Sequence, residues 1–177
     1  MPTTIALAGR RIDPPDAEMP RFPLANVPLV RDRLRALFVE RDAGTLVCSA
    51  ACGADLVALQ VAEALGMRFR IVLPFDPARF RETSVTDRPG DWGQHYDRLV
   101  EAARRAGDLV VLEGAGEGGA AYEAANERII EEATAAPGAR SALIVWEGRP
   151  RGEDDATAGF AEEARRSGLD VQEILTL

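Results

Sequence analysis

The sequence predicts one α/β domain with a mostly parallel sheet of about six strands, flanked by helices. Short apolar runs alternate along the chain with longer segments that carry apolar residues at helical spacing, which is the pattern of βα units. The chain has 177 residues, 46% of them hydrophobic and 28% charged, so it is long enough to bury one sizeable core. No repeat or linker divides it, and we therefore expect a single doubly wound domain over residues 1–177.

Each predicted element rests on a local pattern. The expected strands are the short apolar runs at residues 3–8, 45–48, 69–73, 108–112, 142–146 and 171–175. The expected helices lie at residues 27–38, 54–65, 77–84, 92–106, 121–135 and 157–167, with Asn26 and Thr157 as the expected N-caps of the first and the last. Right-handed crossovers then place the turn after every strand at one edge of the sheet, where such folds bind their ligands.

Composition excludes several function classes. All 21 basic residues are Arg, so the chain offers no lysine for a Schiff base, a Ser–Lys dyad or a P-loop. The net charge of -8 makes a nucleic-acid backbone an unfavourable main partner. His95 is the only histidine, and a surface or capping role is favoured over catalysis. Cys48 and Cys52 are too few to fill a zinc shell, and we expect small buried thiols, no metal and no cofactor.

The chain also lacks the patterns of membrane and secreted proteins. No apolar run approaches the ~20 residues that a membrane span needs. The first residues have no basic region, and the apolar stretch that follows is too short for a signal peptide. We therefore expect a cytoplasmic protein that does not contact a membrane.

The turn after the second expected strand is the main candidate for a ligand site. It reads Ser-Ala-Ala-Cys-Gly-Ala-Asp and leads directly into a helix. Small residues let a phosphate approach the backbone, and a helix N-terminus supplies free amides and the positive end of a dipole. A tight turn that uses small residues only for packing explains the same pattern equally well. The residues expected to contact the ligand are Ser49, Ala50, Gly53, Ala54 and Asp55. Asp55 in the first helical turn is expected either to cap the helix or to bind a ribose hydroxyl.

Further residues follow other strands and would share this edge of the sheet. Two adjacent arginines after the first strand suit a phosphate or a carboxylate, although solvated surface charge explains them as well. A ring and an amide four residues apart on one helix face suit a nucleobase, although packing of the ring on the sheet is an equal alternative. The residues in this group are Gly9, Arg10, Arg11, Arg81, Ser84, Tyr122 and Asn126.

Together these motifs resemble the SLOG superfamily of Rossmann-like domains, which is related to the DprA and lonely-guy proteins. The resemblance covers nearly the whole chain, from Gly9-Arg10-Arg11 through the turn Cys48–Asp55 to Val145-Trp146-Glu147-Gly148. It implies a nucleotide or nucleotide-derived ligand, with Gly9 and Arg10 beside it, a phosphate turn at residues 49–54 and Thr157 in a later turn. Relatives often dimerise, so a homodimer is a further hypothesis.

The resemblance implies two alternative functions. One is a sensor or carrier module for a nucleotide derivative, with Tyr122 or Trp146 stacking on the base. The other is a hydrolase that cleaves the base–ribose bond of nucleoside monophosphates, as the lonely-guy branch does. That branch carries a Pro-Gly-Gly-x-Gly-Thr-x-x-Glu loop, whereas the comparable region here has Phe160 at the position of the Glu, which favours binding. If the chain is an enzyme, Glu147 and Asp76 at strand exits are the expected catalytic carboxylates.

Overall fold

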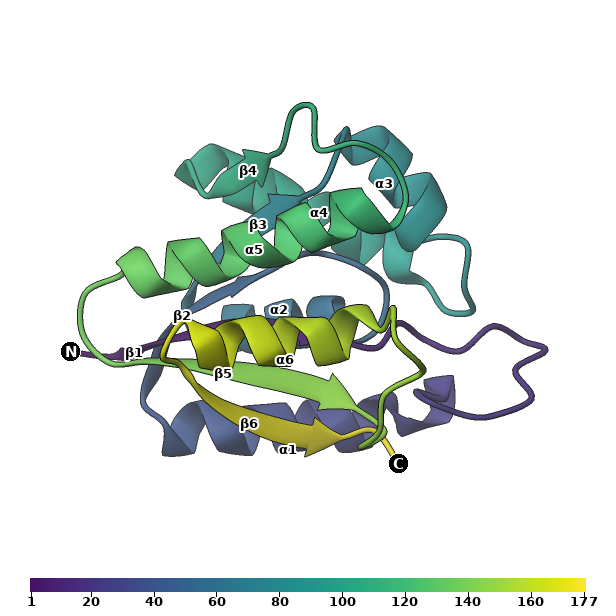
Figure 1. The fold of residues 1–177 in the computed structure, drawn as a ribbon, viewed down its shortest axis with the longest axis horizontal. Coiled ribbons are helices and arrows are strands. Elements are labelled where there is room, and N and C mark those ends of the chain that lie inside the picture. The colour runs from purple at the N-terminus through teal and green to yellow at the C-terminus, as the bar shows by residue number, and fades with distance from the viewer.

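Six parallel strands form one sheet in the order β4-β3-β2-β1-β5-β6 in the computed structural model, which describes residues 1–177 (Figure 1). The strands are β1 (Thr3–Gly9), β2 (Ala43–Cys48), β3 (Arg68–Leu73), β4 (Leu109–Val111), β5 (Arg140–Trp146) and β6 (Asp170–Leu175). The helices are α1 (Val27–Glu40), α2 (Ala54–Ala64), α3 (Pro77–Ser84), α4 (Trp92–Ala106), α5 (Gly119–Ala135) and α6 (Ala156–Arg166), and a 3-10 turn spans Leu24–Asn26. The predicted α/β fold class is confirmed, and every predicted element is present with its ends shifted by at most two residues.

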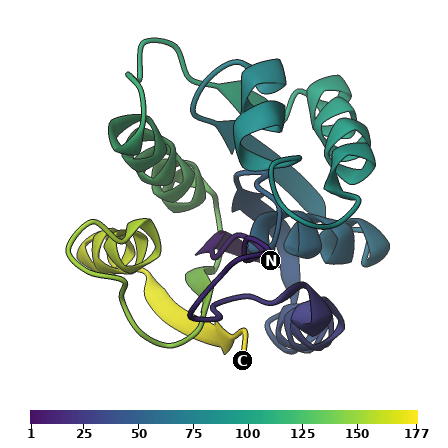
Figure 2. The same ribbon diagram turned by 90° about the vertical axis from the view of Figure 1, so that its right-hand side faces the viewer.

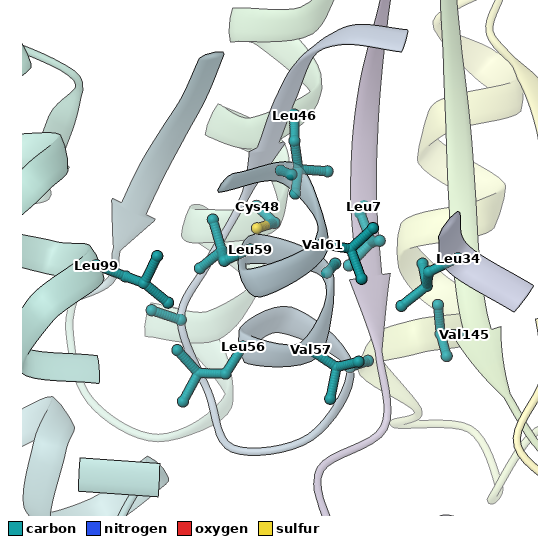
Figure 3. Close-up of a cluster of buried hydrophobic side chains, with 14 of the residues drawn as sticks. Leu7, Leu34, Leu46, Cys48, Leu56, Val57, Leu59, Val61, Leu99 and Val145 are labelled. Atoms are coloured by element: carbon teal, nitrogen blue, oxygen red, sulfur yellow. The ribbon is translucent and has the colours of Figure 1, made fainter. Parts of the chain in front are cut away.

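Helices cover both faces of the sheet. The buried residues of α1, α2 and α4 belong to one core and those of α5 and α6 to a second core on the opposite face, so that Figure 2 shows three layers. The larger core lies under α2, which is apolar nearly all round because α1 and α4 flank it while the sheet lies beneath it (Figure 3). None of the helices combines the length and the apolarity needed to span a membrane.

The strand order places a topological switch between β1 and β5. β1 leads to α1 on one face of the sheet and β5 leads to α6 on the other, so the chain diverges at the carboxyl ends of these two neighbouring strands. Figure 2 looks onto this edge, and the segment that follows β1 crosses in front of it. Gly9 ends β1 at a close approach, since a Cβ there would lie 2.5 Å from the Ala54 Cβ and 2.6 Å from the Val145 carbonyl oxygen.

Asn26 is the N-cap residue of α1 as predicted but makes no capping bond, and the predicted N-cap of α6, Thr157, is wrong. Asn26 lies at the start of α1, but its side chain makes no capping bond and instead donates from Nδ2 to the Thr176 carbonyl at 2.8 Å. Asp155 caps α6 by accepting from the amides of Thr157 and Ala158, at 2.9 and 3.2 Å. Thr157 therefore lies inside the first turn of α6, where it is buried.

Candidate ligand-binding site

A cavity of about 1260 Å³ lies over the carboxyl ends of β1 and β2, between α5 and α6 on one side and the segment after β1 on the other. Its volume is larger than the ~300–1000 Å³ of most small-molecule sites. The predicted site residues that line this main cavity are Gly9, Arg10, Arg11, Ser49, Asp55, Ser84, Tyr122, Asn126 and Thr157. Three others, Ala50, Gly53 and Ala54, lie behind its wall, and Arg81 lies outside it, paired with Asp97 at the surface.

Ser49 and Asp55 form the polar floor of the main cavity at the end of β2. The Oγ atom of Ser49 is buried and has no hydrogen-bond partner in the protein. Asp55 is 8% exposed and accepts a hydrogen bond from the Ala51 amide at 3.1 Å. Burial raises the pKa of Asp55 to about 7, against the opposing effects of the Ala51 amide and the Arg11 charge. A buried hydroxyl without a partner and a carboxyl that titrates near neutrality are features of ligand sites.

The turn that carries Ser49 and Asp55 does not present a row of free backbone amides. Three of its amides are already bonded within the protein: Ala51 to the Asp55 carboxylate, Cys52 to the Ser84 carbonyl and Ala54 to the Arg10 carbonyl, at 3.0 to 3.1 Å. Gly53 has a φ of +110°, and a Cβ there would lie 2.6 Å from the Arg10 carbonyl oxygen. The small residues therefore let the segment after β1 pack against the turn, which corrects the expectation that they give a phosphate access to free amides.

Arg10 occupies the switch point as part of a buried ion cluster with Glu147 and Asp155. Its guanidinium donates to Glu147 from Nε at 2.6 Å and from Nη2 at 3.1 Å, and to Asp155 from Nη1 at 2.7 Å and from Nη2 at 2.8 Å. Burial would raise the pKa of Asp155, but the hydrogen bonds from Arg10 and from the amides of Arg151 and Ala158 hold it well below its ordinary value. Because Arg10 is only 4% exposed and fully engaged, it does not provide the free phosphate donor that the sequence suggested.

Neither carboxylate predicted for catalysis reaches the main cavity. Glu147 is bound by Arg10, and Asp76 caps α3 by accepting from the Arg79 amide at 3.0 Å. Trp146 does not reach it either, because its ring lies against the Arg10 guanidinium, 5.6 Å from ring centroid to Cζ, and its Nε1 donates to Glu173 at 3.0 Å. Glu147 and Asp76 thus make hydrogen bonds within the protein and do not line the main cavity.

The α5 wall of the main cavity carries Tyr122 and Asn126. The Tyr122 hydroxyl and the Ser84 Oγ are hydrogen-bonded at 3.0 Å, and the Tyr122 ring meets the Phe75 ring edge to face at 6.0 Å between centroids. Asn126 donates from Nδ2 to the Ala156 carbonyl at 3.3 Å, which ties α5 to the start of α6. Both residues therefore pack within the fold and also line the main cavity.

Comparison with known proteins places the fold. No family model and no curated protein matches the sequence. Among solved structures, the chain is similar to the X-ray structure of DNA processing protein A (DprA) from Streptococcus pneumoniae, with a TM-score of 0.59 and 16% sequence identity. The chain has a DprA-like fold. The similarity covers 97% of this chain and 50% of that chain, so this chain spans half the length of the DprA chain. The predicted relation to DprA is confirmed for the fold, whereas membership of the SLOG superfamily and the homodimer stay predictions.

Sequence reasoning missed four arginines that line the main cavity, Arg21, Arg88, Arg151 and Arg166, of which Arg21 and Arg151 form no ion pair. The Nη1 atom of Arg21 is buried and has no partner. Arg11 was predicted, but its Nη2 is paired with Asp87 and lies 3.8 Å from the Cys52 sulfur, while its buried Nε has no partner. The unusual length of the loop after the first strand was the one signal that pointed to Arg21, and it could not single out a residue.

Proposed function

We propose that the main cavity binds a nucleotide or nucleotide-derived phosphorylated ligand, and that the chain acts as a sensor or carrier of that ligand. The observation that carries this proposal is the polar floor. There the buried Ser49 hydroxyl has no hydrogen-bond partner, and Asp55 lies in the same turn. An unsatisfied buried polar group costs about 1–3 kcal/mol, and a ligand that completes its hydrogen bonds recovers this free energy.

The polar floor suits the hydroxyl groups of a sugar. One oxygen of Asp55 accepts from the Ala51 amide, and the carboxylate has further acceptor sites for ligand hydroxyls. The Ser49 hydroxyl both donates and accepts, so the two side chains match a pair of neighbouring hydroxyls such as those of ribose.

The α5 wall suits a nucleobase. Tyr122 offers an aromatic ring at the main cavity, and the exposed carboxylates of Glu123 and Glu127 line the same helix. Carboxylates accept hydrogen bonds from the amino groups of a base and repel phosphate groups. This wall is therefore suited to the base end of a nucleotide and not to its phosphates.

A DNA strand fits the same surface less well, although the similar protein is named for DNA processing. Binding of a nucleic-acid backbone depends on clustered positive charge, and this chain has a net charge of -8. We expect no binding of a single-stranded oligonucleotide at 0.15 M salt, measured by fluorescence anisotropy, and submicromolar binding would favour DNA over a small nucleotide.

The test is a ligand screen followed by calorimetry on matched variants. Nucleoside mono-, di- and triphosphates, cyclic nucleotides and ADP-ribose are screened by thermal shift, and we expect at least one to stabilise the protein in a saturable way. Ser49→Ala and Asp55→Asn should each weaken the titrated affinity about tenfold, the effect of one well-made hydrogen bond. The controls Ser167→Ala and Asp32→Asn, both exposed and outside the main cavity, should leave it unchanged. A screen without hits, or equal affinity in all four variants, contradicts the proposal.

A further inference from the structure

We infer that the phosphate group of the ligand binds between Arg21 and Arg151, and not at the turn that carries Ser49 and Asp55. The inference rests on the proposed function and deepens it, because it assigns the anionic end of the ligand to one part of the site. Both arginines line the main cavity and also a second cavity of about 290 Å³ beside it, so they form the wall that the two cavities share. Arg149 lines the second cavity as well.

Neither of these two arginines is neutralised by the protein. The chain has 29 acidic residues against 21 basic ones, and twelve other arginines form ion pairs, but no carboxylate lies within 4 Å of the Arg21 or Arg151 guanidinium. The Nη1 atom of Arg21 is moreover buried without a partner. In a chain with excess acid, two unpaired arginines on one cavity wall point to an anion supplied from outside.

Two carboxylates that line these cavities, Asp155 in the main cavity and Glu147 in the second, are bound to a different arginine. Glu147 and Asp155 both accept from Arg10, so they are not available to Arg21 or Arg151. Partial burial and the positive charges of Arg10 and Arg21 lower the pKa of Arg151. The charged side chains that line the second cavity are those of Arg21, Arg149 and Arg151 and of one acid, Glu147, a balance of +2 in a chain of net charge -8.

The backbone of each arginine is held in place while its side chain stays available. The Arg21 amide donates to the Asp13 carboxylate at 3.0 and 3.2 Å, and the Arg21 carbonyl accepts from the Thr176 hydroxyl. The Arg151 amide donates to the Asp155 Oδ2 at 2.7 Å. Because the backbone of both arginines is already held in place, their side chains can bind a phosphate with little further ordering of the backbone, which favours affinity.

The turn at the end of β2 is a poorer phosphate site. Three of its amides are bonded within the protein, and its buried carboxyl, Asp55, would repel a phosphate whenever it is ionised. This arrangement suits the sugar at the turn and the phosphate at the two arginines.

The experiment uses inorganic pyrophosphate as the probe and the full chain as the protein. Isothermal titration at low salt should show saturable binding to the wild type and at least tenfold weaker binding to Arg21→Gln and to Arg151→Gln. Arg166→Gln is the matched control, because Arg166 lines the same main cavity but pairs with Glu163 at 2.6 Å, and its affinity should change less than twofold. Ser49→Ala should also retain the wild-type affinity for pyrophosphate.

Several outcomes would overturn the inference. These are the absence of pyrophosphate binding to the wild type, an equal loss in Arg166→Gln, or a loss in Ser49→Ala with none in Arg151→Gln. Arg151 is exposed, so its replacement remains a valid test even if Arg21→Gln fails to fold.

Pyrophosphate carries no base or sugar, so its result separates this inference from the proposed function. A pyrophosphate site at the two arginines with no nucleotide binding would contradict the nucleotide proposal and leave the anion site standing. A nucleotide that binds equally well to wild type, Arg21→Gln and Arg151→Gln would leave the proposed function standing and refute the anion site.

Discussion

Replacing Asp55 by Asn tests whether burial at the floor of the main cavity raises the pKa of this carboxyl group. Asn keeps the shape of the side chain and can still accept the hydrogen bond that the Ala51 amide donates at 3.1 Å. It removes only the charge that the buried carboxyl acquires as the pH rises. The variant therefore separates the electrostatic cost of this site from its packing.

The expected size follows from the pKa of Asp55, which burial raises from 3.8 to about 7. Between these two pH values the folded state keeps a proton that the unfolded chain has lost, so the stability of the wild type falls by about 1.4 kcal/mol for each pH unit. Above pH 7 the accumulated cost is about 4 kcal/mol. The stability advantage of Asp55→Asn should thus grow by about 2 kcal/mol between pH 5.5 and pH 7, and should stop growing by about pH 8.

Urea unfolding curves of both proteins, recorded at half-unit steps from pH 5.5 to 8.5, measure this difference. Taking the difference cancels the titration of the other carboxylates, and Asp32→Asn on the exposed face of α1 provides a baseline that should be flat. A pH-independent difference between wild type and Asp55→Asn would show that Asp55 titrates normally, and would refute the reasoning about its burial.

Three further substitutions test other parts of the site. Gly53→Ala should destabilise the protein by about 2 kcal/mol or more in urea unfolding, because φ is +110° and the Cβ would meet the Arg10 carbonyl at 2.6 Å; a neutral effect would contradict this packing. Asp155→Asn should cost about 3 kcal/mol at pH 7, and because the pKa of Asp155 is lowered in the folded state, this loss should shrink as the pH falls below 3.8; a loss that is constant from pH 7 to pH 3 counts against the ion cluster. Tyr122→Phe should lose about 1 kcal/mol of stability with its bond to Ser84 but keep nucleotide affinity, whereas Tyr122→Leu should lose affinity in calorimetry; equal affinity in both would exclude base stacking.

The fold could be predicted from the sequence because each element has a strong local signal. Apolar runs such as residues 142–146 and helical spacing such as that of residues 92–106 are independent of tertiary context. Parallel strands all end at the same edge of a sheet, and this rule predicted that residues at the ends of β1 and β2 would lie together, as they do in the lining of the main cavity. Asn26 makes no capping bond because its side chain donates to the carboxyl-terminal segment, whereas the cap of α6 is local and lies two residues before the predicted Thr157, at Asp155.

The roles of the charged residues could not be predicted, since they depend on pairing across the fold. Arg10 and Glu147 are 137 positions apart, and nothing local shows that each binds the other. Gly9-Arg10-Arg11 therefore suggested two free donors, whereas one is buried in an ion cluster and the other is paired with Asp87. The two arginines of the main cavity that form no ion pair, Arg21 and Arg151, lie in loops where sequence offers no periodic signal.

The ion cluster also explains why the main cavity lies where it does. In open parallel sheets the crevice at the switch point is the usual ligand site, and here that crevice lies between β1 and β5. Arg10, Glu147 and Asp155 fill it with four charge-assisted hydrogen bonds, and the main cavity extends over β1 and β2. The same cluster fixes the loop after β5, because Arg10 also donates to the Arg149 carbonyl at 3.0 Å. Arg10 is therefore a positioning residue: it closes the usual site and holds the loop from which Arg151 reaches the main cavity.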